Sequence, residues 1–259
     1  MMPMRAAIRF LALNLFAATM LAGTSVQAGT FSCRETPIVQ PVAALSGLAT
    51  RVTQGRSLEI LAIGSSSTEG IGASAKDKTY PARLRAMLGK AWPNLSVDIV
   101  NAGIGGETAP QTLVRLKKAL AERRYDLVIW QVGTNDAVNG GDLAKFRSMV
   151  TEGIAMVRQA GPSLAILDPQ FFPGVREPER YRSFVEAIAE TARLQSVPVF
   201  TRYDAMREWY GRDAQGFTSA LSSDGFHMSD AGYDCLARDM ATALVGMATP
   251  PRAVVAQSR

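Results

Sequence analysis

The chain has a single histidine, His227, and it stands three residues after Asp224 in the segment Ser-Ser-Asp-Gly-Phe-His. Histidine is the side chain whose ordinary pKa lies nearest neutrality, so this imidazole is the first candidate for proton transfer. An Asp-x-x-His spacing in a tight turn brings the carboxylate within reach of the ring, where it can hold one tautomer and stabilise the imidazolium. Taken alone, the segment fits a surface histidine beside a helix cap better than a catalytic pair.

Three glycine-rich segments upstream change that balance. They read Gly-Ser-Ser-Ser-Thr-Glu-Gly at 64–70, Asn-Ala-Gly-Ile-Gly-Gly-Glu-Thr at 101–108 and Gly-Thr-Asn-Asp at 133–136. A serine in a glycine-flanked turn leading into a helix can present its hydroxyl with free N–H groups nearby. Gly106 lets its own N–H approach an oxyanion closely, and Asn135 can offer an amide N–H to the same oxygen. Together with Asp224 and His227 these groups would complete an acyl-transfer site.

Each segment also has a simpler interpretation. The serine run alone fits a plain turn, and residues 133–136 could cap a helix. Residues 101–106 could cradle a phosphate, but the dinucleotide-binding signature follows the first strand of its fold, and here it would follow the second. The catalytic interpretation is favoured because the three segments stand at the ends of predicted strands and the sole histidine comes last.

The elements that must position these residues alternate between strand and helix patterns. Short apolar runs predict strands, and longer runs of helical periodicity predict the helices between them. The strands are expected at 58–63, 95–100, 126–132, 164–167 and 197–200, and the helices at 80–91, 109–123, 142–159, 178–195 and 229–245. This alternation predicts a parallel sheet covered on both faces, with functional groups beyond the carboxyl ends of its strands.

The four segments resemble the conserved blocks of the SGNH, or GDSL-type, hydrolases. The family pattern Gly-Asp-Ser-x-Thr-x-Gly falls on residues 64–70, and the remaining blocks match Gly106, Asn135 and the Asp224–His227 pair. The resemblance implies a three-layer α/β/α, flavodoxin-like fold. It also implies ester hydrolysis without a cofactor by a triad of Ser66, Asp224 and His227. The oxyanion hole would consist of Ser66, Gly106 and Asn135.

One position departs from the family pattern. The aspartate that usually precedes the nucleophile is Ser65 here, which leaves three consecutive serines. Thr68 and Gly70 fix the register, because only Ser66 stands two residues before the threonine and four before the glycine. The missing aspartate is not the triad acid of the family, so its loss is expected to change the hydrogen bonding of the turn and not the chemistry.

The first 28 residues have the pattern of a signal peptide. Arg5 and Arg9 precede an apolar run at 10–22, and Val26-Gln27-Ala28 supplies small residues for cleavage before Gly29. That run is too short to span a membrane comfortably, and no later stretch approaches the roughly 20 residues needed. We therefore expect a periplasmic or secreted protein with an N-terminal arm at 29–56, one hydrolase domain at 57–247 and a tail at 248–259.

Composition narrows the classes of partner. With 259 residues and 47% hydrophobic content, the chain suits one α/β domain. The formal net charge is +5, but no basic helix or arginine run accompanies it, so nucleic-acid binding is not expected. One histidine and two distant cysteines offer no ligand cluster, so we expect neither a metal nor a cofactor. The oligomeric state is left open.

Two cysteines, Cys33 and Cys235, belong to the expected mature chain. An exported protein meets oxidising conditions, so we hypothesise a disulfide that joins the arm to the helix after His227. The alternative, nearly as well supported by the sequence, is that Cys235 is a buried apolar filler and Cys33 lies in a disordered arm.

The substrate is the least defined part of the prediction. Phe171-Phe172-Pro173 and Trp209-Tyr210 are candidates for lining the cleft, although core or lid packing is the favoured interpretation for them. Polar, glycine-rich loops without a long apolar lid favour a small acyl group on a glycan or another small ester. Two alternatives stay open: a glycan O-acyltransferase that uses the same residues, and a non-catalytic glycan-binding module.

Overall fold

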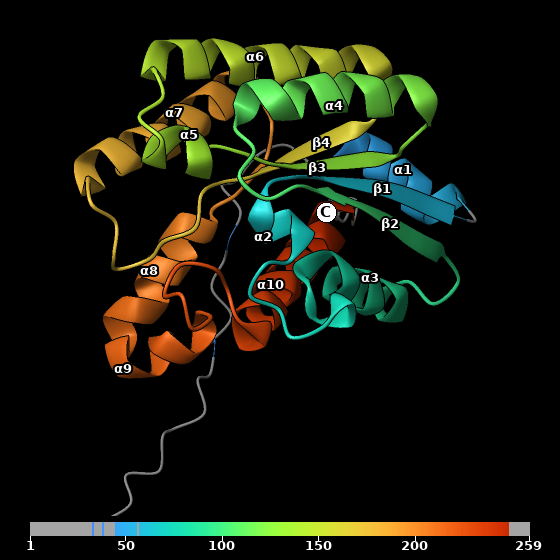
Figure 1. Cartoon of the computed structure of the whole chain (residues 1–259). Coiled ribbons are helices and arrows are strands. Elements are labelled where there is room, and N and C mark those ends of the chain that lie inside the picture. Colours follow the sequence, from blue (N-terminus) through green and yellow to red (C-terminus); the bar gives the residue numbers. More distant parts are fainter. Residues whose placement is uncertain (1–32, 34–37, 39–44, 56, 249–259) are drawn as a thin grey trace, which may run out of the picture.

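The computed structural model describes Cys33, Ile38, residues 45–55 and residues 57–248 (Figure 1). The predicted signal peptide at 1–28 lies outside the described residues, and so do residues 249–259 of the predicted tail. Within the described part, no helix combines the length and the apolar character needed to cross a membrane.

The centre of the molecule is a five-stranded sheet in which every pairing is parallel. The strand order is β2-β1-β3-β4-β5, which confirms the predicted parallel sheet. The strands are β1 (Ser57–Gly64), β2 (Ser96–Gly103), β3 (Leu127–Gln131), β4 (Ser163–Leu167) and β5 (Val199–Phe200).

Helices cover both faces of this sheet. The longer ones are α1 (Ser46–Gln54), α3 (Tyr80–Ala91), α4 (Ala109–Glu122), α6 (Leu143–Ala160), α7 (Pro178–Leu194), α8 (Arg202–Arg212) and α10 (Asp230–Ala248). The short ones are α2 (Ser66–Glu69), α5 (Thr134–Val138), α9 (Ala214–Phe217) and the 3₁₀ turns Lys76–Lys78 and Thr218–Ala220. Figure 1 shows α4, α6 and α7 on one side of the sheet and α3 and α10 on the other. The three-layer α/β/α prediction is therefore confirmed.

The central strands each contain a continuous apolar run, as expected where both faces of a sheet are covered. Residues 60–63 of β1, 127–130 of β3 and 165–167 of β4 are fully buried. Continuous runs of this kind are typical of parallel strands, whereas a half-exposed strand would alternate apolar and polar residues. The same burial makes Gln131, at the end of β3, stand out as a buried polar side chain in an apolar strand.

The strand register brings the predicted site segments together. Gly64, the last residue of β1, pairs with Gly103 of β2, and Gln131 of β3 pairs with Leu167 of β4. The loops after all four strands therefore begin at one edge of the sheet, as expected for a parallel arrangement.

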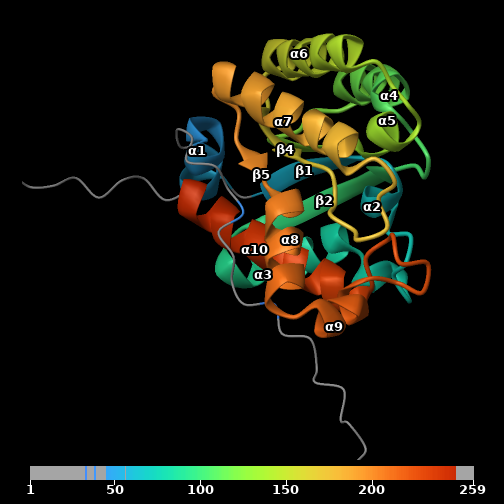
Figure 2. The same ribbon diagram turned by 90° about the vertical axis from the view of Figure 1, so that its left-hand side faces the viewer.

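Two of the longer helices were not predicted from the sequence. Helix α1 lies inside the expected N-terminal arm and buries only one residue, Leu48, so its apolar pattern is weak. Helix α8 follows β5 and contains many polar residues, among them the fully buried Arg202. Figure 2 shows α1 close to α10, so part of the predicted arm packs on the rest of the described chain.

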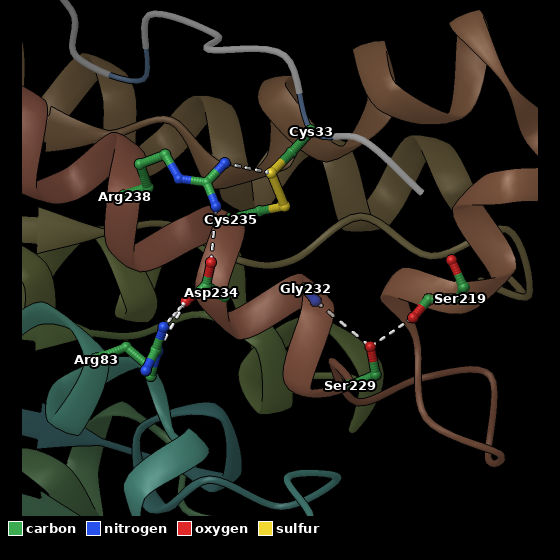
Figure 3. Close-up of a disulfide and its surroundings, with 8 residues drawn as sticks. All are labelled: Cys33, Arg83, Ser219, Ser229, Gly232, Asp234, Cys235 and Arg238. Carbon is green, nitrogen blue, oxygen red and sulfur yellow. Dashed lines mark hydrogen bonds and ion pairs between the residues drawn. A yellow bond between two sulfur atoms is a disulfide. The ribbon is translucent and has the colours of Figure 1, made fainter. Parts of the chain in front are cut away.

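The hypothesised disulfide is present in the structure. Cys33 and Cys235 are bonded with their Cα atoms 5.8 Å apart (Figure 3). Arg238 of α10 donates to the Cys33 sulfur over 3.3 Å and to Asp234 over 2.7 Å. Asp234 also accepts from Arg83 of α3, so the disulfide sits at the end of a polar chain that joins two helices.

Candidate active site

The loop at residues 222–227, called the acid–base loop below, holds the Asp224 carboxylate and the His227 ring together. His227 Nδ1 lies 2.6 Å from Asp224 Oδ2. The other carboxylate oxygen accepts hydrogen bonds from the Ser222 hydroxyl and from the backbone N–H groups of Phe226 and His227, at 2.7–2.9 Å. All four contacts arise within six residues, so the pair is organised by its own loop.

These hydrogen bonds also set the protonation state of Asp224. Partial desolvation raises the pKa of this carboxyl, but the hydrogen bonds from Ser222, His227 and the backbone outweigh it, and the pKa lies well below its ordinary value. The carboxylate therefore stays ionised over the whole neutral range, as a group that orients an imidazole and stabilises its cation must.

The turn at residues 65–68, called the nucleophile turn below, begins helix α2. Ser65 precedes the helix with a non-helical backbone, and its carbonyl accepts from the N–H groups of Thr68 and Glu69. Ser66 is the first helical residue and is only 6% exposed. The path from strand through turn to helix thus places the Ser66 side chain at the carboxyl edge of the sheet. The loop that follows β2 begins beside it.

Gln131 fixes the position of this turn from the neighbouring strand. Its side-chain oxygen accepts from the Ser65 backbone N–H at 2.7 Å, from the Ser65 hydroxyl at 3.1 Å and from the Thr68 hydroxyl at 3.3 Å. Ser65, which replaces the usual family aspartate, therefore has a buried partner. With serine at this position the turn is anchored, and the effect of the exchange on the hydrogen bonding of the turn stays a prediction.

Gln170 joins the nucleophile turn to the acid–base loop. Its side-chain oxygen accepts from the Ser67 hydroxyl at 2.6 Å, and its amide N–H donates to the Phe226 carbonyl at 3.0 Å. Gln170 is fully buried, and its own carbonyl accepts from Tyr181. One amide thus links the residue after Ser66 to the residue before His227.

The chain after α2 makes a second contact with the acid–base loop. Gly72 has a left-handed backbone, and a Cβ there would lie 3.1 Å from the His227 Cβ and 2.4 Å from the Met228 carbonyl. A larger residue would push the two segments apart. Nearby, Tyr233 donates to the Ile71 carbonyl at 2.7 Å and so ties this segment to α10.

The three predicted oxyanion donors come from the start of α2, from the loop after β2 and from α5, which all follow strands at this edge of the sheet. Among the described residues, the backbone N–H groups of Ser66 and Gly106 have no hydrogen-bond acceptor. The Asn135 amide donates to the Glu107 carbonyl at 2.7 Å, which holds the side chain beside the Gly106 loop and leaves its second N–H available. Gly106 itself adopts a left-handed backbone that favours glycine.

Charged side chains brace the loop that carries Gly106. Arg115 donates to both oxygens of Glu107 at 2.9 Å and to the carbonyls of Ala102 and Gly64. It therefore ties the ends of β1 and β2 to this loop.

Asp136, next to Asn135, holds the start of helix α4. Both of its oxygens accept from the Ala109 N–H, at 2.9 and 3.1 Å. Burial raises the pKa of Asp136, and the backbone N–H groups that it accepts from oppose that rise.

One expected contact is absent. Within the described residues, the Ser66 hydroxyl makes no hydrogen bond to the His227 ring, whose one hydrogen-bond partner there is Asp224. Catalytic hydrogen bonds are often long in proteins without substrate and tighten when substrate binds. Ser66 and His227 therefore stay a candidate pair.

Three side chains that hold the loops of the site, Gln131, Gln170 and Arg115, were not predicted from the sequence. Gln131 carried a signal, since it is the one polar residue at the end of an apolar strand. Gln170 follows β4 in Asp-Pro-Gln-Phe-Phe, at the same sheet edge as the other loops. Arg115 lies on an ordinary amphipathic helix and gave no signal.

The aromatic residues considered for the cleft divide into two groups. Phe171 packs with Tyr203, Tyr210 and Phe217 at centroid distances of 5.5–6.0 Å, and Trp209 is only 3% exposed. These residues fit the packing interpretation.

Phe172 differs from them because it reaches toward the site. It contacts Phe226 edge-on at 4.7 Å and lines a hollow of about 450 Å³. The hollow lies between the residues at the end of α5 (137–140) and those at 172–181.

The model of the Non-GDSL lipase-like family matches residues 33–250. An arylesterase of Vibrio mimicus is 24% identical over 169 residues, which are 60% of this chain and 79% of that protein. An acetylxylan esterase of Geobacillus stearothermophilus is 26% identical over 212 residues, which are 71% of this chain and 92% of that protein.

Solved structures share the same architecture. A peptidoglycan O-acetylesterase superposes with a TM-score of 0.66 over 82% of this chain and 99% of its own, at 15% identity. At that identity the superposition is informative about the fold alone.

Proposed function

The chain belongs to the Non-GDSL lipase-like family, and on that premise we propose that it is an exported serine esterase with a Ser66, His227 and Asp224 triad. It is a carboxylic ester hydrolase of the SGNH type, like the relatives named as esterases. The observation that carries the triad is the convergence of two segments: an ionised Asp224 bonded to His227, and a serine turn joined to that loop through Gln170.

The proposed reaction has two stages. His227 accepts the Ser66 proton as the serine oxygen attacks the ester carbonyl carbon, and it then passes that proton to the departing alcohol oxygen as the C–O bond breaks. Water next attacks the acyl-serine bond, gives its proton to His227 and releases the acid, and the proton returns to Ser66. Asp224 stays ionised throughout and stabilises the imidazolium.

The oxyanion of each tetrahedral intermediate would bind three donors: the N–H groups of Ser66 and Gly106 and the Asn135 amide. Two of these groups have no other acceptor among the described residues, and the third has an N–H to spare. Donors already held in place need no reorganisation as charge develops on the oxygen.

We further propose a small acyl group on a glycan, or on another small ester, as the substrate. The acetylxylan esterase and the peptidoglycan O-acetylesterase are named for substrates of that kind. Export is supported by the signal-peptide pattern at 1–28 and by the disulfide, which is typical of oxidising compartments.

Labelling with a fluorophosphonate tests the triad without a choice of substrate. We expect one adduct, mapped by mass spectrometry to Ser66, no adduct in Ser66→Ala and strongly slowed labelling in His227→Ala. An adduct on Ser65 or Ser67, or none at all, would contradict the assignment. Product analysis with an oligosaccharide acceptor then separates hydrolysis from acyl transfer.

A further inference from the structure

The hollow of about 450 Å³ beside helix α5 has no role in the proposed acyl transfer. One wall is the end of α5, whose second residue is the oxyanion candidate Asn135. The opposite wall includes Phe172, which contacts Phe226, and the Phe226 ring in turn lies 4.7 Å from the His227 ring. Each wall therefore adjoins a segment that carries a group of the proposed site.

The hollow combines an apolar wall with charged groups. Ala137, Val138, Phe172 and Val175 supply the apolar surface. Val138 is an apolar residue that is 46% exposed. A ligand in the hollow would therefore cover apolar surface that now faces solvent. A volume of this size exceeds the needs of an acetyl group and falls in the range of sites for small organic ligands.

Three charged residues line the hollow, and two of them are already occupied. Arg180 pairs with Glu177 at 3.7 Å and donates to the Gly141 carbonyl, and its guanidinium lies 5.4 Å above the Phe184 ring. Arg176 is exposed and has no ion pair or hydrogen bond with any described residue. The hollow therefore carries one uncompensated positive charge, on a side chain that is free to bind.

We propose that this hollow is a subsite for a negatively charged part of the ester, and that Arg176 recognises its carboxylate. The proposal rests on the esterase function above and specifies its substrate class: an ester with a carboxylate, separated from the reacting carbonyl by a short apolar portion. The planar guanidinium suits a carboxylate because it can donate two parallel hydrogen bonds. Val138 and Phe172 would cover the apolar portion.

The carboxylate can belong to the acyl group or to the alcohol, and two pairs of esters distinguish these sources. For the acyl side, 4-nitrophenyl hexanoate is compared with the 4-nitrophenyl monoester of adipic acid, which has a carboxylate at the chain end. For the alcohol side, 4-acetoxybenzamide is compared with 4-acetoxybenzoate. Each pair changes the charge and keeps the size nearly constant.

The variants are Arg176→Gln, Arg176→Glu and, as the matched control, Arg182→Gln. Arg182 is an exposed arginine of α7 that pairs with Glu186 and does not line the hollow. We expect Arg176→Gln to raise KM for the charged ester of one pair about tenfold, as expected for loss of one charge-assisted contact. Its kcat, and both constants for the neutral ester, should stay unchanged. Arg176→Glu should raise that KM further, and Arg182→Gln should match the wild type.

The outcomes separate the subsite from the esterase function. If the wild type hydrolyses charged and neutral esters alike, and the Arg176 variants change neither, the subsite is wrong and the esterase function stands. A KM rise shared by the charged and neutral esters would also overturn it, because it would mean a structural role for Arg176. If the wild type hydrolyses none of the four esters and takes no fluorophosphonate, both proposals fall.

Discussion

The nucleophile turn and the acid–base loop reach the same site by different physical means. The turn is buried, and its hydroxyls and N–H groups are held by Gln131 and Gln170, which lie 66 and 103 residues away in the chain. The acid–base loop is more open, with the Asp224 side chain 45% exposed, and the four hydrogen bonds to the Asp224 carboxylate all arise within six residues. The serine turn is held by distant parts of the fold, whereas the Asp224–His227 pairing is organised within its own loop.

This difference indicates where the site can tolerate change. A local loop can re-form its hydrogen bonds after small movements of the protein, because donors and acceptor move together. The nucleophile turn depends on long-range partners in a buried setting, where an unpaired polar group costs about 1–3 kcal/mol. Damage to the sheet edge should therefore reach the serine before it reaches the Asp224–His227 pair.

The largest expected effect tests whether the two regions form one catalytic unit. Ser66→Ala and His227→Ala should each lower kcat for 4-nitrophenyl acetate on the order of 10⁶-fold, and the double variant should lose little more. Circular dichroism checks that each variant is folded. If the fold-losses in kcat multiply in the double variant, the two residues act independently, and the two regions do not form one catalytic unit.

Asp224→Asn tests the acid–base loop by itself. The amide oxygen can keep the bonds from Ser222 and the backbone, but its NH₂ group would face His227 Nδ1 and favour the tautomer that cannot accept the serine proton. We expect a loss in kcat of roughly 10⁴-fold with little change in Tm.

Ser222→Ala is the control for that variant, since it removes one local hydrogen bond and keeps the carboxylate. We expect it to lower kcat less than tenfold. An equally inactive Ser222→Ala would show that the loop is not organised as described.

Gln170→Ala tests the long-range support of the nucleophile turn. It would leave the Ser67 hydroxyl and the Phe226 carbonyl without their buried partner, so kcat should fall about 10–100-fold with KM little changed, and Tm should fall as well. Gln170→Glu keeps an acceptor for the Ser67 hydroxyl but has no donor for the Phe226 carbonyl. Its kcat should lie between those of the wild type and Gln170→Ala. If both variants keep wild-type kcat and lose only Tm, Gln170 is structural and does not position the site.

A matched control for that pair is Gln195→Ala. Gln195 is a partly exposed glutamine after α7 that bonds to Arg158 far from the site. The Gln195→Ala variant should leave kcat and KM unchanged.

The smallest effect concerns acid stability. The pKa of Asp224 is lower in the folded protein than the ordinary value of about 3.9, so its contribution to stability is complete above that value and disappears as pH falls through the folded pKa. Between pH 5 and pH 2.5 the wild type should therefore lose slightly more free energy of unfolding than Asp224→Asn, as measured by urea titration. Equal losses would mean that the loop does not hold the carboxylate in its ionised form.

The same contrast explains what the sequence could predict. The Asp224–His227 pair was visible from local spacing, and the sheet from its apolar runs, because both depend on near neighbours. Gln131 and Gln170 act across 60 residues or more, and only the folded sheet brings them to the serine turn. Family resemblance supplied the register of Ser66, which three consecutive serines left open.

Helix α8 could not be predicted from the sequence for a different reason. Its residues have mostly polar side chains, and the fully buried Arg202 donates to the Asp168 carbonyl from inside the molecule. Hydrophobic periodicity does not predict such a helix, because part of its packing surface is polar. The pairing of Cys33 with Cys235 was likewise open until the fold brought them within 5.8 Å.

The disulfide turns most of this chain into a closed covalent loop. It joins residues 202 positions apart, and Ser66, Gly106, Asn135, Asp224 and His227 all lie between them. A single protease cut anywhere in that span would leave both fragments attached, so a nicked molecule would gain only the mass of one water until a reductant separates the fragments. The two halves of the proposed site would thus remain on one molecule after the backbone between them is broken.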